Sequence, residues 1–279
     1  MNYFNCNGKL FEAHTAVIGP DNRGLRFGDG LFETLKCSKG QLLMADEHFA
    51  RLWKGMQVLQ FQVPKLFSPD TLQEEISALL KKNGHQQSAR IRVTVYRGDG
   101  GLFDAVNHIP NHIIQSWELP ETNGQWNSNG LVLGIYDEVK KSPDILSNLK
   151  HNNYLSGVMA ALYAKAQKWN DAIILNTAGR ICETTIANIF LIRDGIVSTP
   201  ALAEGCVAGV FRKLLLRELA SQDIKVMEKE IDQDELMQAD EIFLTNAIYN
   251  IRWVQGIGGK VYDNRLTQKI YSTLPPTIL

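Results

Sequence analysis

The stretch GLFETLKCSKGQLLMADEHFARLWKGMQVLQ, residues 30 to 60, decides the fold class because two structural periods meet in it. Its first part is predicted to form two short strands joined at Lys39-Gly40, a pair suited to a tight turn. After this turn the apolar residues, beginning with Phe49 and Leu52, recur three or four positions apart, which is the spacing of a helix. Strand and helix signals this close together predict an α+β fold.

The same two patterns continue on both sides of this stretch. The N-terminal run YFNCNGKLFEA is predicted to be a hairpin, because Asn7-Gly8 is a preferred two-residue turn. The segment SPDTLQEEISALLKKNG is predicted to be a second helix that begins at a Ser or Asp cap and ends at Gly84. The segment ARIRVTVYRG alternates apolar and polar residues, as a half-buried strand does.

A polar, turn-rich segment predicts two domains. The run ELPETNGQWNSNG, residues 118–130, has neither period and is interpreted as an interdomain linker. Residues 1–117 are predicted to form an N-terminal α+β domain, and residues 131–279 a C-terminal α+β domain. In the second domain the predicted strands are LVLGIYDEV, DAIILNT, IANIFLI, IKVMEKEI and DEIFLTNA, and the predicted helices are NYLSGVMAALYAKAQ and GVFRKLLLRELASQ.

Composition and charge favour a globular protein whose partner is a small molecule or another copy of itself. The 279 residues are 44% hydrophobic, and 29 Lys and Arg nearly balance 30 Asp and Glu, so no charged field favours nucleic acid or a membrane. The N-terminus lacks the features of a signal peptide, which predicts a cytoplasmic location. Four widely spaced cysteines without a C-x-x-C pair suggest neither a disulfide framework nor a metal site.

Lys150 is the first candidate for chemistry. It lies in LKHNNYL, directly before a predicted helix. The predicted buried stripe of that helix consists of Leu155, Val158, Met159 and Leu162. A surface lysine is commonly a solvating charge. A lysine held between a strand and a helix could instead be desolvated, which would lower its pKa and let its amine form a Schiff base with a carbonyl cofactor.

Glu183, in GRICETTIANIFLI, is the second candidate. The simpler interpretation is an exposed turn acid beside Arg180. A pyridoxal phosphate enzyme, however, needs an acidic partner at the pyridine nitrogen, because a protonated ring withdraws the electrons released when a substrate Cα bond breaks. Glu183 could be that partner.

Two segments could hold a phosphate. Gly209 precedes a predicted helix, so the backbone amides of Val210 and Phe211 could point at an anion; a flexible helix entrance is the alternative. Arg51, in EHFARL, could bind phosphate through two hydrogen bonds. An exposed ion pair is the alternative for Arg51, and the sequence alone does not choose.

Taken together, these segments resemble the fold-type IV, class IV family of pyridoxal-phosphate enzymes. This family holds branched-chain aminotransferases, D-amino acid aminotransferases and 4-amino-4-deoxychorismate lyases. The resemblance spans nearly the whole chain and rests on four segments in order: DNRGLRFGDGLFETL (Asp21 to Leu35), EHFARL, LKHNNYL and ETTIANIFLI. It implies two α/β domains of the fold-type IV kind joined by an interdomain loop, with pyridoxal 5'-phosphate as the cofactor of the C-terminal one.

The resemblance also assigns roles to three side chains. Lys150 is implied to be the Schiff-base lysine that also shuttles a proton. Glu183 is implied to contact the pyridine nitrogen, and Arg51 the phosphate.

Further cofactor contacts are implied for the backbone amides of Val210 and Phe211 and for Asn188 in the adjoining loop. The family pattern is altered at two positions. Phe211 stands where many relatives have a threonine, and Ala247, implied to lie in the phosphate-binding loop, replaces another one. Both changes remove a hydroxyl, so a lower cofactor affinity is expected.

Substrate recognition is predicted to depend on arginines in segments that the family uses to line its site: Arg26, Arg90, Arg92 and Arg97. Because arginine holds a carboxylate in a two-pronged fork, a substrate with one or two carboxylates is favoured. Strand alternation places Arg90 and Arg92 on one face and Arg97 on the other unless a bulge intervenes. Arg97 is favoured for the substrate carboxylate, Arg90 next, and Arg92 last.

Three functions remain open at this stage. The leading one is an aminotransferase that moves the amino group of a small amino acid, D-configured rather than branched-chain, to a 2-oxo acid. The alternative is a lyase that releases pyruvate from 4-amino-4-deoxychorismate and leaves 4-aminobenzoate. The third is a non-catalytic cofactor-binding protein, which the presence of both Lys150 and Glu183 disfavours. The resemblance further implies a homodimer, with the loop from Arg23 to Gly30 reaching the partner's site.

Overall fold

The computed structural model describes residues 2–103, 107–120 and 123–275 of the chain. The chain forms two compact units: Met1–Asn123 with Leu149–Asn153, and Gly124–Asn148 with Tyr154–Leu279. The predicted C-terminal domain, 131–279, includes the segment Leu149–Asn153, which the structure groups with the first unit instead. The linker 118–130 and both predicted domains include a few residues that lie outside the described ranges.

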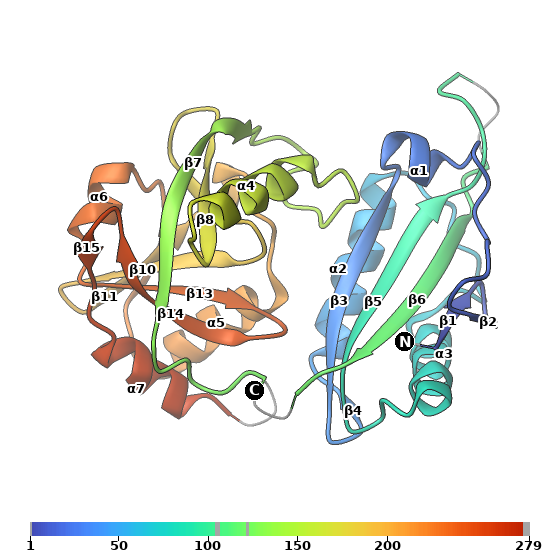
Figure 1. The fold of residues 1–279 in the computed structure, drawn as a ribbon, viewed down its shortest axis with the longest axis horizontal. Helices are drawn as coiled ribbons and strands as arrows, with labels where there is room; N and C mark the ends of the chain where they lie inside the picture. Colours follow the sequence, from blue (N-terminus) through green and yellow to red (C-terminus); the bar gives the residue numbers. More distant parts are fainter. Residues whose placement is uncertain (1, 104–106, 121–122, 276–279) are drawn as a thin grey trace. The chain divides into compact units, whose positions relative to one another are not determined.

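The first unit is built on an antiparallel sheet in the order β2-β1-β6-β5-β3-β4 (Figure 1). Its strands are β1 (Tyr3–Cys6), β2 (Lys9–Glu12), β3 (Gly30–Ser38), β4 (Gln41–Leu42), β5 (Ser88–Arg97) and β6 (Pro110–Glu118). Both predicted hairpins are confirmed. Asn7-Gly8 and Lys39-Gly40 each adopt two successive positive φ angles, 50° and 83° in the first turn and 50° and 78° in the second, as a two-residue hairpin turn requires.

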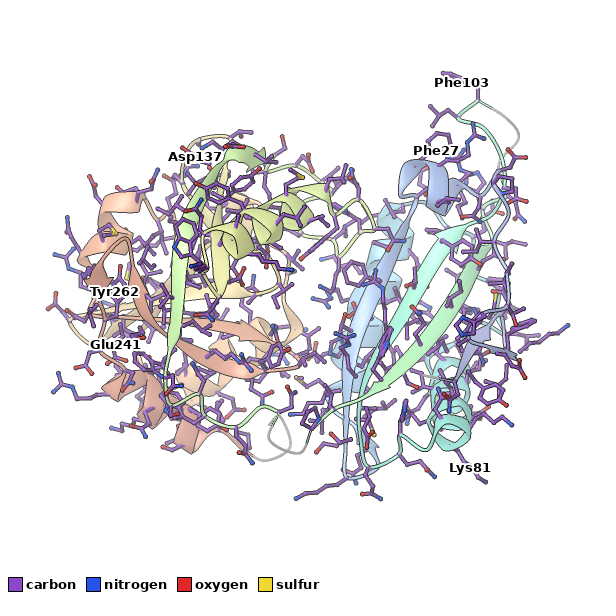
Figure 2. The ribbon with its side chains drawn as sticks, viewed as in Figure 1. Phe27, Lys81, Phe103, Asp137, Glu241 and Tyr262 are labelled. Carbon is purple, nitrogen blue, oxygen red and sulfur yellow. The ribbon has the colours of Figure 1, made fainter. Side chains whose placement is uncertain are left out.

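Helices α2 (Ala45–Val58) and α3 (Pro69–Asn83) pack against one face of this sheet and lie behind it in Figure 1. The predicted caps of α3 are present: Ser68 Oγ accepts a hydrogen bond from Thr71 N, and Gly84 ends the helix at φ 72°. The core of the unit forms where apolar residues of β3 and β5 meet both helices. A short helix, α1 (Arg23–Phe27), precedes β3. Its Phe27 and the fully exposed Phe103 are labelled in Figure 2.

The second unit contains a mixed sheet in the order β12-β11-β10-β13-β14-β7-β8-β9, with β15 paired to β14. Its strands are β7 (Leu131–Lys141), β8 (Asp171–Asn176), β9 (Ile181–Thr184), β10 (Asn188–Arg193), β11 (Ile196–Pro200), β12 (Val226–Lys229), β13 (Glu241–Asn246), β14 (Asn250–Ile257) and β15 (Lys260–Val261). The five predicted strands correspond to β7, β8, β10, β12 and β13. This arrangement of sheets and helices confirms the predicted α+β class.

The helices of the second unit are α4 (Leu155–Ala166), α5 (Val210–Ser221), α6 (Gln233–Gln238) and α7 (Arg265–Thr273), with a 3₁₀ turn at Leu202–Glu204. Among the described residues, no helix is both long and apolar enough to cross a membrane.

The predicted buried stripe of α4 is wrong. Leu155, Val158, Met159 and Leu162 are between 45% and 71% exposed. The buried residues of α4 are Gly157, Ala160 and Ala164. The small side chains face β7 and β8, because they let the helix approach the sheet closely, and the large apolar side chains therefore point away from it.

Candidate active site

Lys150 is held by backbone pairing to β3. Phe32 N donates a hydrogen bond to Lys150 O at 2.8 Å, and Asn152 N donates one to Gly30 O at 2.9 Å. The neighbouring Leu149 is buried in the core of the first unit. These contacts fix the backbone on both sides of Lys150, so the lysine belongs to a short pairing segment and not to a loose surface loop.

Phe32 brings an arginine close to Lys150. Lys150 Nζ lies 4.4 Å from the centroid of the Phe32 ring, and the guanidinium carbon of Arg92 lies 3.7 Å from the same centroid. Arg92 Nε also donates to Thr94 Oγ1 at 3.2 Å. Arg92 and Lys150 thus place two cationic groups around one aromatic ring in the first unit.

Arg97, favoured for the substrate carboxylate, is instead enclosed by protein partners. Its Nε donates to Asp29 Oδ2 at 3.0 Å, its Nη1 lies 2.7 Å from His108 Nδ1, and its Nη2 donates to the carbonyl of Leu59. Only 6% of the residue is exposed. The geometry therefore favours a structural role for Arg97, which ties Asp29, at the start of β3, to the end of α2.

The two remaining arginines lie at the surface. Arg90 is exposed and stacks 4.5 Å from the centroid of the Trp117 ring. Arg26, at the end of α1, lies 3.8 Å from Asp21 and rests on the ring of Phe27. In the described residues the structure brings neither side chain into contact with Lys150.

Arg51 is bound by a buried acid that sequence reasoning missed. Arg51 Nε donates to Glu33 Oε1 at 2.8 Å, and Arg51 Nη2 donates to Glu33 Oε2 at 2.6 Å. His48 Nδ1 lies 2.7 Å from Glu33 Oε2. We call Glu33, His48 and Arg51 the first-unit cluster.

Two opposing effects determine the pKa values of Glu33 and His48 in the first-unit cluster: burial of each side chain, and its interactions with the charged or hydrogen-bonding groups beside it. Burial alone raises the pKa of Glu33, but the charge of Arg51 and the hydrogen bond from His48 outweigh burial and lower it to about 2. Burial lowers the pKa of His48 despite the opposing effect of Glu33. At neutral pH the cluster therefore holds an ionised Glu33 and a neutral His48 whose Nδ1 carries the proton.

In the second unit, Glu183 is buried and held at both oxygens. Its Oε1 pairs with the ammonium of Lys141, and its Oε2 accepts a hydrogen bond from Val207 N at 2.8 Å. Burial disfavours the charged form of Lys141, but the adjacent Glu183 outweighs it and raises the Lys141 pKa. Glu183 is thus a buried, paired carboxylate and not an exposed turn acid, and Lys141 is a second residue that sequence reasoning missed.

The start of α5 can receive an anion. Gly209 is the N-cap residue and makes no side-chain cap, so the first-turn amides of Val210 and Phe211 have no partner within the helix. Asn188 lies beside this turn: its Nδ2 donates to Val207 O, and a Cβ on Gly209 would come within 2.0 Å of its Oδ1. Position 209 therefore requires glycine.

Ala247 lies in a turn at the end of β13. Asn246 Oδ1 accepts hydrogen bonds from Ile248 N and Tyr249 N, which fixes this turn. The hydroxyl of Thr245, two residues before Ala247, is buried and has no hydrogen-bond partner among the described residues. A buried hydroxyl without a partner is consistent with a polar group that binds there.

Comparison with known proteins identifies the family. The model of the amino-transferase class IV family matches residues 30–257. The chain belongs to this family.

Two curated relatives of this class IV chain have different activities. An aminodeoxychorismate lyase from Vibrio harveyi is 31% identical over 238 residues, which is 85% of this chain and 86% of the relative. A D-alanine aminotransferase from Bacillus licheniformis is 25% identical over 98% of this chain and 96% of the relative. The crystal structure of 4-amino-4-deoxychorismate lyase from Pseudomonas aeruginosa is 27% identical, with a TM-score of 0.83 and coverage of 97% of each chain.

The class IV family, to which the chain belongs, uses pyridoxal 5'-phosphate as its cofactor. The residues present fit it. In the second unit, the N-terminus of α5 and the Thr245 hydroxyl, which has no partner among the described residues, suit an anionic group, and Glu183 is a buried acid. In the first unit, Lys150 carries its amine on a backbone held by β3. The specific reaction of the chain is a separate question, because its class IV relatives include both lyases and aminotransferases.

Proposed function

We propose that this protein is a 4-amino-4-deoxychorismate lyase, which releases pyruvate and leaves 4-aminobenzoate. The proposal rests mainly on one observation: the cationic groups of Arg92 and Lys150 both lie close to the ring of Phe32. An arginine and an aromatic ring beside the reactive amine suit a cyclic substrate that carries carboxylates. The greater identity to the Vibrio harveyi lyase than to the Bacillus licheniformis aminotransferase supports the same choice.

The environment of Arg97 is evidence against the alternative function, an aminotransferase for a small amino acid. An aminotransferase for a small amino acid needs a cation that grips the α-carboxylate common to its substrates. The sequence favours Arg97 for that contact, but Asp29, His108 and the Leu59 carbonyl already engage its guanidinium. Transfer of an amino group from a small D-amino acid to a 2-oxo acid is therefore the second candidate, supported by the full-length match to the D-alanine enzyme.

The class IV resemblance supplies the proposed role of each residue. When bound, pyridoxal phosphate supplies an electron sink for the bonding pair that leaves the substrate carbon. The amine of Lys150 binds the cofactor and then moves the substrate proton. Glu183, held in place by Lys141 and Val207 N, contacts the pyridine nitrogen. Arg51 and the amides of Val210 and Phe211 bind the phosphate.

The residues around these groups complete the proposed site. Asn188 positions the turn before α5 through its hydrogen bond to Val207 O. Ala247 contributes only its backbone, since it has no hydroxyl. Arg92 binds a substrate carboxylate, and Arg26 and Arg90 remain proposed outer contacts that attract the same charge.

We also propose a homodimer. The exposed residues of α4 are spaced three and four apart on one helical face: Leu155, Val158, Met159 and Leu162. Such a stripe is uncommon on a surface that faces only water, and it can bury itself against the same stripe of a second copy.

A substrate comparison tests the proposed reaction. The purified protein is supplied with 4-amino-4-deoxychorismate, and 4-aminobenzoate and pyruvate are measured together. Parallel reactions contain D-alanine or L-leucine with 2-oxoglutarate. The proposal expects equal amounts of both lyase products and little amino transfer. Amino transfer from D-alanine at a higher kcat/KM than lyase turnover would establish the aminotransferase instead.

A further inference from the structure

We propose that Glu33 and His48 are positioning residues that orient Arg51 toward the cofactor phosphate. This inference rests on the proposed phosphate role of Arg51 and adds a function for two residues of the first-unit cluster. Neither residue needs to touch the cofactor itself.

The location of Glu33 calls for an explanation beyond stability. On β3 the inward-facing positions are Leu31, Glu33 and Leu35, and Glu33 pairs across the sheet with the fully buried Val93. Only 1% of Glu33 is exposed. A charged pair on an apolar face is often no more stable than apolar residues of the same size, so a buried pair is better explained by the geometry that it imposes.

The hydrogen bonds of Glu33 fix the guanidinium of Arg51 in one orientation. Nε and Nη2 form one edge of the guanidinium, and Glu33 occupies that edge with both of its oxygens. The plane and direction of the group are therefore set by β3. Nη1 lies on the other edge of the guanidinium, and the proposal has this edge face the phosphate.

His48 prevents the Glu33 carboxylate from rotating. It lies three residues before Arg51 on α2, so both side chains reach Glu33 from the same helical face. His48 Nδ1 shares Glu33 Oε2 with Arg51 Nη2, and His48 itself is completely buried. Rotation of the carboxylate would break contacts to both partners at once.

The test compares pyridoxal 5'-phosphate with pyridoxal, which lacks the phosphate. The intact chain is freed of cofactor, and binding of each compound is titrated by absorbance. Arg51→Gln should weaken binding of the phosphorylated compound about tenfold to a hundredfold, the range for a charge-assisted hydrogen bond, and leave pyridoxal unchanged. Glu33→Gln should show the same selective loss. The double variant should lose no more than Arg51→Gln alone, because both changes remove one interaction.

Glu75→Gln is the matched control. Glu75 also pairs with a histidine in the first unit, with Oε2 lying 2.6 Å from His112 Nε2, but this histidine lies on β6 and not on α2. This variant should keep the parent's ratio of the two affinities even if its stability falls. A changed ratio in Glu75→Gln would show that general loosening of the unit is enough, and would overturn the positioning role.

The outcomes separate the two proposals. If Arg51→Gln leaves the ratio of affinities unchanged, the phosphate role of Arg51 is wrong. If Arg51→Gln changes the ratio and Glu33→Gln does not, only the positioning role is wrong. Glu33→Asp keeps the negative charge but moves it away from Arg51 by the length of one methylene group. This variant should therefore also bind pyridoxal 5'-phosphate more weakly and bind pyridoxal as the parent does. That variant decides the question should Glu33→Gln fail to fold.

Discussion

Replacing Arg92 by leucine should reduce kcat/KM for 4-amino-4-deoxychorismate while leaving cofactor absorbance unchanged. Arg92 rests 3.7 Å from the centroid of the Phe32 ring, and leucine can keep part of this apolar contact. The substitution therefore removes mainly the charge. Loss of a hydrogen bond to a charged group costs about 1.5–3 kcal/mol, which corresponds to a decrease of roughly tenfold to 150-fold in kcat/KM.

Arg97→Leu should reduce stability and leave substrate binding nearly unchanged. In the parent protein the buried guanidinium of Arg97 pairs with Asp29, which Arg23 also contacts. Breaking a buried pair costs about 3–5 kcal/mol, and the lower end is expected because Arg23 remains. The unfolding free energy should fall by about 3 kcal/mol, with little change in KM for the protein that remains folded. Arg90→Leu, which alters an exposed arginine stacked on Trp117, should lower kcat/KM less than Arg92→Leu, because Arg90 is proposed only as an outer contact.

Steady-state kinetics and urea unfolding of the three variants test this assignment. The reasoning is refuted if Arg97→Leu folds normally and loses substrate affinity while Arg92→Leu keeps the parent's kcat/KM. That result would return the substrate carboxylate to Arg97 and favour the aminotransferase.

Three further predictions concern Glu183, acid stability and assembly. Glu183→Gln should lose most of kcat with cofactor still bound, because a neutral amide does not hold the ring nitrogen protonated; an unchanged kcat would limit Glu183 to a structural role. Glu33 has a folded pKa of about 2, below its unfolded value of about 4.3, so its contribution of up to about 3 kcal/mol is complete above pH 4.3 and lost as pH falls toward 2. Urea unfolding from pH 7 to pH 3 should therefore show a smaller loss in Glu33→Gln than in the parent, and equal losses would contradict this. Mixing weakened Arg26→Ala chains with inactive Lys150→Ala chains should give more activity than the average of the two, because hybrid dimers contain one intact site. Met159→Lys should dissociate the dimer in sedimentation. A fully active monomer would exclude both expectations.

Features that depend on neighbouring residues could be predicted from the sequence. The turn at Asn7-Gly8 needs only two residues that accept positive φ, and the ends of α3 need only Ser68 and Gly84. The alternation in β5 likewise placed Arg97 on the side opposite to Arg92, which agrees with its burial. The segments that hold Lys150 and Glu183 could be found because family resemblance added to these local signals.

Features that depend on distant residues could not be predicted in the same way. No local pattern shows that Leu149–Asn153 pairs with β3, more than a hundred residues earlier in the chain. The apolar period of α4 was recognised, but the period does not say whether the large or the small side chains pack on the sheet. Glu33 did leave a signal, since an acid stands between the inward-facing Leu31 and Leu35. The role of Glu33 can be recognised only when its contacts with His48 and Arg51 on α2 are known, and only the folded structure shows these contacts.

The most direct test of the account is to locate the cofactor on the chain. Borohydride reduction of the purified protein, followed by digestion and mass spectrometry, should find the cofactor mass on the peptide that contains Lys150. Reduction should also abolish turnover of 4-amino-4-deoxychorismate in proportion to the labelled fraction. A label on Lys141 or Lys36, two lysines with little exposure, would contradict the assignment of Lys150 as the lysine that carries the cofactor.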